Sequence, residues 1–146
     1  MSRRIIKDRA IVTDDWIHVG VGDAVPPAGA VIVPLALWRE RQGDLAGRRV
    51  GVRLEPTDDP GSVDLDGVDL VAISFPKFTD GRGLSLARLL RQRHGYRGEL
   101  RAVGDVLRDQ LAFMARCGFD AFEVRADKNL DDALNAFGEI TVTYQP

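Results

Sequence analysis

The sequence predicts an α/β fold: an open, mostly parallel sheet flanked by helices, with a short N-terminal β-hairpin extension. From residue 70 onward, short apolar runs alternate with segments whose apolar residues recur every three or four positions, which is typical of βαβ units. The beginning of the chain instead suggests short strands around a polar turn. At 146 residues and 45% hydrophobic composition, the chain has the size of one globular domain. We therefore expect a single domain over 1–146, with a β extension at 1–22 and a core at 31–144.

The N-terminal half contains short strands and one predicted helix. Residues 5–12 suggest two strands around a turn, and Trp16–Val19 a third. Two prolines and a glycine between 23 and 30 indicate a linker. The elements expected next are a strand at 31–33, a helix at 35–41 opened by Pro34, a strand at 49–54 and an irregular connection at 55–67.

The C-terminal half is more regular. Strands are expected at 70–75, 100–103, 121–124 and 140–143. Three helices are expected between them. The first runs from Ser85 to Gly95, and the second from a cap formed by Asp105 to Gly118. The third begins near Asp127 or Asn129. A complete eight-fold barrel needs about 250 residues, so this chain could supply only about half of one, and an open three-layer sandwich is the preferred arrangement.

Composition excludes several classes of function. A formal net charge of −2 and a pI near 5.7 provide no general attraction for nucleic acid or an acidic membrane. Charges interrupt the N-terminal apolar residues, and no run approaches the ~20 apolar residues of a spanning helix. The single Cys117 cannot form an internal disulfide, which favours a cytoplasmic location. His18 and His94 are isolated, so no metal site is predicted.

Common catalytic and cofactor motifs are absent from the sequence. There is no G-x-G-x-x-G after a strand, no G-x-x-x-x-G-K-[ST], no G-x-S-x-G and no H-E-x-x-H. Nicotinamide, nucleoside triphosphate, serine-hydrolase and zinc-protease assignments thus lose their usual support, and the cofactor is left unknown.

The strongest candidate site lies in the loops at the carboxyl ends of the parallel strands, at 76–83, 104–108 and 125–128. In a parallel sheet these loops share one edge, and helix N-termini at Ser85 and Val106 would add N–H donors for an anion. The predicted ligand-binding residues are Lys77, Thr79, Arg82, Arg108 and Gln110, and the predicted proton-transfer residues are Asp80 and Asp105. Helix capping by the two aspartates, and pairing of the cations with these acids, is the structural alternative.

Two other residues have plain structural explanations beside functional ones. Gln110 lies on the interior side of its turn, where a buried hydrogen bond accounts for it. Cys117 stands at a helix C-terminus, away from any feature that lowers a thiol pKa except the neighbouring Arg116. A small buried hydrophobic residue is the favoured role, and a redox or sulfur-carrying thiol the alternative.

Three segments carry a family resemblance: 75–83, 97–110 and 116–122. In these segments the chain resembles the bacterial family called domain of unknown function 934, whose members are described as probable oxidoreductases involved in sulfite reduction because their genes lie beside those of sulfite reductase components. The pattern keeps Lys77, Asp80, Arg82, Asp105, Arg108 and Gln110. It departs at Leu84 and Ala112, where an aromatic residue is usual, so ligand stacking is not expected there.

The resemblance implies an accessory protein or probable oxidoreductase component of assimilatory sulfite reduction, with sulfite reductase as the partner and a small oxyanion as the ligand. The sequence contains no haem, flavin or iron–sulfur ligation pattern, so the chain is not expected to be the six-electron reductase itself. The alternatives are an oxidoreductase using a bound flavin or nicotinamide, and a non-catalytic structural partner of sulfite reductase. The sequence does not decide between a monomer and a homo-oligomer.

Overall fold

A computed structural model describes residues 3–45, 47–59, 61, 65, 67–76 and 81–124 of the chain. Within these ranges, eight strands form one mixed sheet in the order β2-β1-β8-β7-β6-β5-β4-β3, accompanied by three α-helices. This confirms the predicted α/β class. The helix expected from Asp127 or Asn129 and the strand expected at 140–143 lie outside the described residues.

The N-terminal extension is the predicted hairpin. Strands β1 (Arg3–Lys7) and β2 (Ala10–Asp14) pair antiparallel across a two-residue turn. The turn residues Asp8 and Arg9 have φ of 51° and 63°, as the tight turns of twisted hairpins require. The other edge of β1 pairs antiparallel with β8 (Ala121–Phe122), which joins the hairpin to the main sheet.

The remaining strands are all parallel and follow one another in chain order. They are β3 (Ile17–His18), β4 (Val31–Pro34), β5 (Val50–Leu54), β6 (Leu70–Phe75), β7 (Glu99–Gly104) and β8. The helices are α1 (Leu35–Leu45) after β4, α2 (Arg82–Gln92) after β6, and α3 (Leu111–Cys117) after β7, the last preceded by the 3₁₀ turn η2 (Arg108–Gln110).

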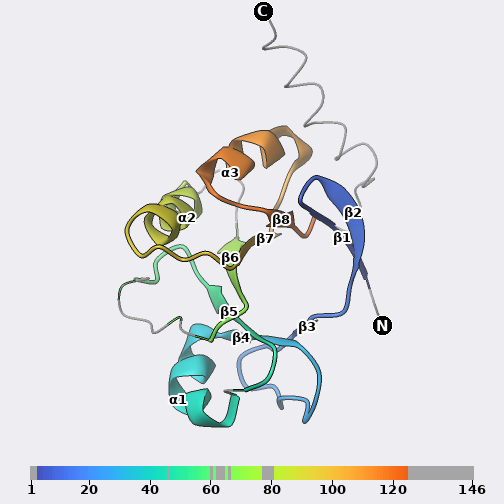
Figure 1. Ribbon diagram of the computed structural model, residues 1–146, viewed down its shortest axis with the longest axis vertical. Coiled ribbons are helices and arrows are strands. Elements are labelled where there is room, and N and C mark those ends of the chain that lie inside the picture. Colours follow the sequence, from blue (N-terminus) through green and yellow to red (C-terminus); the bar gives the residue numbers. More distant parts are fainter. Residues whose placement is uncertain are drawn as a thin grey trace, which may run out of the picture.

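This strand order places the helices on one face of the sheet, not on both. A right-handed crossover carries the chain to the next strand over the same face, and here every parallel step goes in the same direction. A three-layer sandwich needs the order to reverse partway through the sheet. Figure 1 accordingly shows α1, α2 and α3 along the outer side of a curved sheet. The three-layer part of the prediction is therefore wrong.

The main core fills the space between the sheet and the helices. Strand β6 directs Val71, Ile73 and Phe75 towards this core, and each is at most 1% exposed. Helix α2 contributes Leu86 and Leu90, four residues apart and so on one helix face. A smaller core on the concave face contains Trp16, Ala30, Ile32, Leu70, Ala72 and Val103.

The sheet curls into a half-barrel, which Figure 1 shows as an arc with β1–β2 at one end and β3 at the other. Strands β3 and β8 are five strands apart, which is about 24 Å in a flat sheet. Yet His18 Nε2 in β3 lies 2.8 Å from Glu123 Oε2, directly after β8. Only Asp15 and Trp16 link β2 to β3, the two edge strands. Strong curvature is the only way to satisfy both facts.

Two helices start at positions that differ from the predictions. Helix α2 begins at Arg82 instead of Ser85, and α3 begins at Leu111, so Asp105 is not its cap. The backbone explains the second difference. Gly104 adopts a φ of +94°, and the N–H of Asp105 donates to the carbonyl of Phe75 at 2.7 Å. The chain thus crosses the rim of the sheet before any helix can start.

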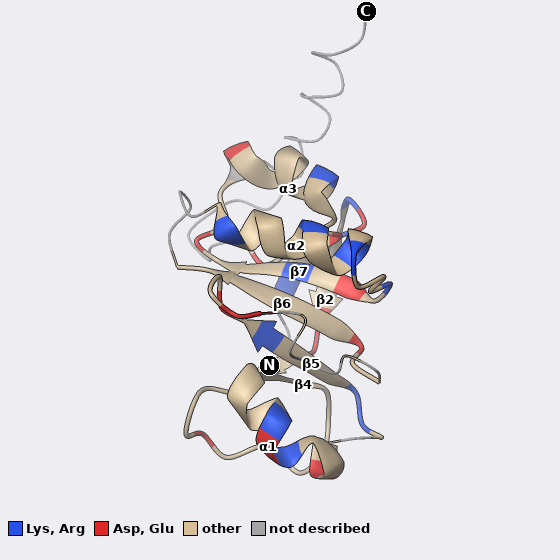
Figure 2. Ribbon diagram, turned by 90° about the vertical axis from the view of Figure 1, so that its left-hand side faces the viewer, with Lys and Arg blue, Asp and Glu red and all other residues tan. Residues whose placement is uncertain are grey.

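Charges are distributed unevenly over the helices. Figure 2 shows only basic residues on α2, whereas α1 carries both basic and acidic residues. Over the portion of the chain that the structure describes, no helix combines the length and apolar character needed to cross a membrane.

Candidate functional site

A pocket of about 620 Å³ opens at the carboxyl ends of β4, β5 and β6. Its walls come from the β4–α1 junction, the concave face of the sheet and the turn that follows β5. The polar side chains that line it are Arg39, Arg53, Glu55, Asp58 and Ser74. This is the sheet edge at which open α/β folds commonly bind ligands, and the volume is in the range of about 300–1,000 Å³ of small-molecule sites.

Arg53 lines the pocket because of strand alternation. Val50, Val52 and Leu54 of β5 point into the main core, so Arg53 points to the concave face. It is paired in register with Pro34 of β4. Its Nη2 donates to the carbonyl of Val19 at 3.3 Å, which fixes the half-buried guanidinium at the pocket.

Arg39 and Ser74 line the pocket from a helix and a strand, respectively. Helix α1 starts directly after β4, so the exposed Arg39 is just over one turn into the helix. Ser74 precedes the last residue of β6 and, unlike Ile73 and Phe75, is directed to the concave face. Together with Arg53, these side chains offer two cationic groups and a hydroxyl donor.

The two acids of the pocket have different roles. The Asp58 carboxylate accepts a hydrogen bond from the N–H of Glu55 at 2.7 Å, and the N–H of Asp58 donates to the carbonyl of Glu55 at 3.0 Å. Asp58 therefore closes the turn after β5. Glu55 has an exposed side chain at the pocket wall. Arg53 and Arg39, each of which also has an interaction within the protein, supply the positive charge of the pocket.

Three of the predicted site residues have described side chains. Arg82 is exposed at the first position of α2, Asp105 is half-buried directly after β7, and Gln110 is half-buried at the end of η2. Each of them is engaged in an interaction within the protein. Phe75 and Gly104 are paired in register, so the loops after β6 and β7 leave the sheet side by side. The roles of these three residues towards a ligand stay predictions.

The other predicted site residues lie wholly or partly outside the description. Lys77, Thr79 and Asp80, together with the loop at 125–128, fall outside the described residues. For Arg108 the backbone is described as part of η2, and its side chain is not. Since α3 begins only at Leu111, the N-terminal anion site expected at Val106 does not exist. That expectation is wrong.

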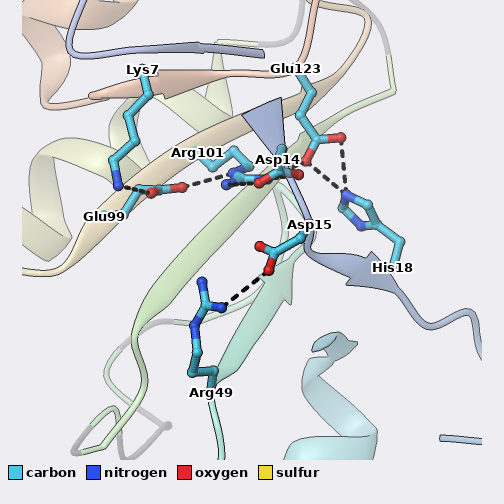
Figure 3. Close-up of polar contacts among 8 residues, drawn as sticks. All are labelled: Lys7, Asp14, Asp15, His18, Arg49, Glu99, Arg101 and Glu123. Carbon is cyan, nitrogen blue, oxygen red and sulfur yellow. Dashed lines mark hydrogen bonds and ion pairs between the residues drawn. The ribbon is translucent and has the colours of Figure 1, made fainter. Parts of the chain in front are cut away.

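A second polar cluster surrounds Arg101 on the concave face, drawn in Figure 3. Its guanidinium, 1% exposed, makes two hydrogen bonds of 2.9 Å to the Asp14 carboxylate. It also donates to Glu99 at 2.8 Å and to Glu123 at 3.0 Å. Glu99 in turn binds Lys7 at 3.0 Å. This cluster joins the N-terminal hairpin to β7 and to the end of β8.

The carboxylates of this cluster raise the pKa values of the two cations that they contact, Arg101 and Lys7. Burial alone acts to lower the pKa of Arg101, but the hydrogen bonds that it donates to Asp14 and Glu123, together with the charge of Glu99, outweigh burial and raise the pKa overall. The hydrogen bond and charge of Glu99 likewise raise the pKa of Lys7. Arg101 is thus a permanently charged, buried group. Its near-zero exposure makes it a structural residue rather than a ligand contact.

The prediction from sequence missed both Arg53 and Arg101. Each is a cation in a mainly apolar strand, with apolar neighbours on both sides in the sequence. Because side chains alternate between the two faces of a sheet, this pattern indicates a charge on the face opposite the main core. The N-terminal partners, Asp14 and His18, show no comparable local signal. Among the residues that the structure describes, no group of three or more His, Cys, Asp or Glu is arranged to hold a metal ion.

Comparison with known proteins identifies the family. The family described as "Bacterial protein of unknown function (DUF934)" matches residues 51–146. The chain belongs to the DUF934 family. The comparison with curated proteins found no match. The DUF934 match includes Arg53, Ser74 and Arg101 and leaves Arg39 and Asp14 on its N-terminal side. The part of this chain that matches DUF934 therefore supplies Arg53 to the pocket, and the preceding part supplies Arg39.

Proposed function

We propose that this DUF934 protein is a cytoplasmic accessory component of assimilatory sulfite reduction that binds an anionic ligand at the carboxyl edge of its sheet. One observation carries the binding part: a pocket of about 620 Å³ with Arg53 and Arg39 on its walls and Ser74 beside them. Guanidinium groups bind sulfur and phosphorus oxyanions through charge-assisted, paired hydrogen bonds. The pathway part rests on the family resemblance and on no feature of the pocket.

The residues predicted in the loops after β6 and β7 extend this proposal. Arg82 starts the helix after β6, and Lys77 and Thr79 belong to the same loop in sequence. In the proposal they add contacts to the anion, and Asp80 or Asp105 transfers a proton if a reaction takes place. Sulfite reductase is the proposed protein partner. The protein would then hold the anion next to the reductase and leave the electron transfer to it.

Binding is tested by thermal unfolding in sodium sulfite or sodium sulfate against sodium chloride of equal ionic strength. At an anion concentration of about 100 times Kd, a gain of about 2.7 kcal/mol is expected, which raises the Tm of a protein of this size by roughly 5–11 °C. Arg53→Gln should weaken binding at least about tenfold, because it removes a charge-assisted contact. The matched control is Arg93→Gln, at an exposed arginine just beyond α2.

Equal effects of chloride and the oxyanions, or unchanged stabilisation in Arg53→Gln, would refute the binding proposal. The pathway is tested by deleting the gene and growing cells on sulfate, sulfite or cysteine as sole sulfur source. Rescue by cysteine but not by sulfite places the defect at the reduction step, and equal growth on all three removes the assignment. Co-purification with sulfite reductase that survives Arg53→Gln would instead favour a purely structural partner.

A further inference from the structure

A second, smaller pocket adjoins the proposed anion site. It has a volume of about 240 Å³ and lies between α1 and the loop that follows β3. Val21, Pro34 and Ala36 line both pockets, so the two share a wall along the β4–α1 junction. A single ligand lying across this wall would contact both.

The two pockets differ in chemistry. The larger one carries Arg39 and Arg53, whereas the smaller one is lined mainly by apolar side chains, with Leu37 added to the shared residues. Of its two acids, Asp23 accepts a hydrogen bond from the N–H of Gly20 at 3.0 Å and so closes the loop, and Glu40 is exposed on α1. The smaller pocket therefore suits an uncharged, apolar group.

The larger pocket has room for more than an inorganic oxyanion. Its volume of about 620 Å³ lies in the middle of the range of about 300–1,000 Å³ found for small-molecule sites, whereas sulfite has only four heavy atoms. Small-molecule sites usually cover most of the ligand surface, which favours a larger ligand here.

Val21 is an exposed apolar residue that lines both pockets. It is 87% exposed, a high value for a β-branched apolar side chain, and it stands at the boundary of the two pockets. A ligand that spans the boundary would cover this side chain and remove apolar surface from water.

We infer that the ligand is an organic acid: its anionic group binds Arg53 and Arg39, and its apolar body lies against Val21 and Leu37 in the adjoining pocket. This inference rests on the proposed function, because it assigns the ligand class of the same site. It differs from that proposal in requiring an apolar part on the ligand.

The test uses two fluorescent probes that differ only in the acidic group. 8-Anilinonaphthalene-1-sulfonate has a sulfonate on an aromatic body, and N-phenyl-1-naphthylamine has the same body without the sulfonate. The sulfonate probe should bind the folded protein at one site, at least about tenfold more tightly than the neutral probe, and sodium sulfate should compete with it.

The variants separate the two halves of the site. Arg53→Gln should weaken binding of the sulfonate probe at least about tenfold. Val21→Ser should weaken it roughly three- to tenfold, because it removes apolar contact with the aromatic body of the probe. The control is Ile17→Ser, at a second exposed β-branched residue (45% exposed) that lines neither pocket. It should bind the probe like the wild type.

The outcomes distinguish this inference from the proposed function. If sulfate stabilises the protein through Arg53 and the sulfonate probe does not bind, or binds equally in Val21→Ser, the organic-acid inference is wrong and the anion site stands. If neither sulfate nor sulfite stabilises the protein, the proposed function fails. Binding of the sulfonate probe that depends on both Arg53 and Val21 supports the inference.

Discussion

Replacing Arg101 by methionine should strongly destabilise the protein. The variant fills a similar volume but removes both 2.9 Å hydrogen bonds to Asp14, whose side chain is only 4% exposed. Breaking a buried ion pair from one side costs about 3–5 kcal/mol, because the remaining charge stays desolvated. All three carboxylates keep another interaction within the protein, Glu99 with Lys7 and Glu123 with His18. We therefore expect the total loss to lie within this range and not beyond it.

The measurement is urea unfolding followed by the fluorescence of Trp16 and Trp38, which are 8% and 2% exposed in the folded protein. A loss of about 3–5 kcal/mol corresponds to a Tm lower by roughly 6–20 °C for a chain of this size. Arg93→Met, at an exposed position after α2, is the control and should change stability by less than about 0.5 kcal/mol.

A double-mutant cycle makes the reasoning refutable. Asp14→Asn removes the buried charge, so combining it with Arg101→Met should cost less than the sum of the single changes, by about 1–3 kcal/mol. An Arg101→Met variant within about 1 kcal/mol of the wild type would contradict the assigned role. Additive single changes would show instead that the two side chains stabilise the fold independently.

Three further variants test other features. Gly104→Ala should lose roughly 1–3 kcal/mol in urea unfolding, because φ is +94° and a Cβ would lie 2.6 Å from the carbonyl oxygen of Phe75; an unchanged midpoint would contradict this. Lys7→Met should cost at most about 1 kcal/mol at pH 7, since the lysine is 43% exposed. Because the pKa of Lys7 is raised, the wild type should have a higher Tm than Lys7→Met below about pH 10.5, and this difference should disappear as the pH rises further. Burial raises the pKa of Asp120 above its ordinary value of 3.8, so its ionised form is disfavoured in the folded state and stability from this group falls as pH rises. The Tm of Asp120→Asn minus that of the wild type should therefore increase as the pH rises from 4 to 7, and a decrease of this difference would disprove the reasoning.

Local patterns were sufficient to predict most of the individual elements. The strand at 70–75 is confirmed with its bounds, and the hairpin follows from two apolar runs around a polar turn. The helix predicted at 35–41 is part of α1, which runs to Leu45, but Arg41 has the non-helical angles φ −123° and ψ 28°, so the predicted end coincides with a kink. Residue spacing along one segment carries this information, so these elements could be predicted.

The curvature and the pocket could not be predicted in this way. The sheet curls through contacts such as His18 with Glu123, which lie 105 residues apart in the chain and leave no periodic trace. The pocket is lined by Arg53 and Ser74, which are strand residues, whereas the prediction concentrated on loops. The expected cap at Asp105 failed because a backbone hydrogen bond to Phe75, far from it in sequence, holds that residue at the rim.

The pairing of β1 has a consequence for how the chain is made. On its inner edge β1 pairs with β8, where Ile6 meets Phe122, so β1 must wait for the last strand that the structure describes before it can dock there. At about 5–20 residues per second, the roughly 116 residues from Ile6 to Phe122 take about 6–23 s to be synthesised. During that interval the hairpin presents Ile5 and Ile6, at most 1% exposed in the finished fold, to water. Nascent chains of this protein therefore depend on β8 to bury the hairpin.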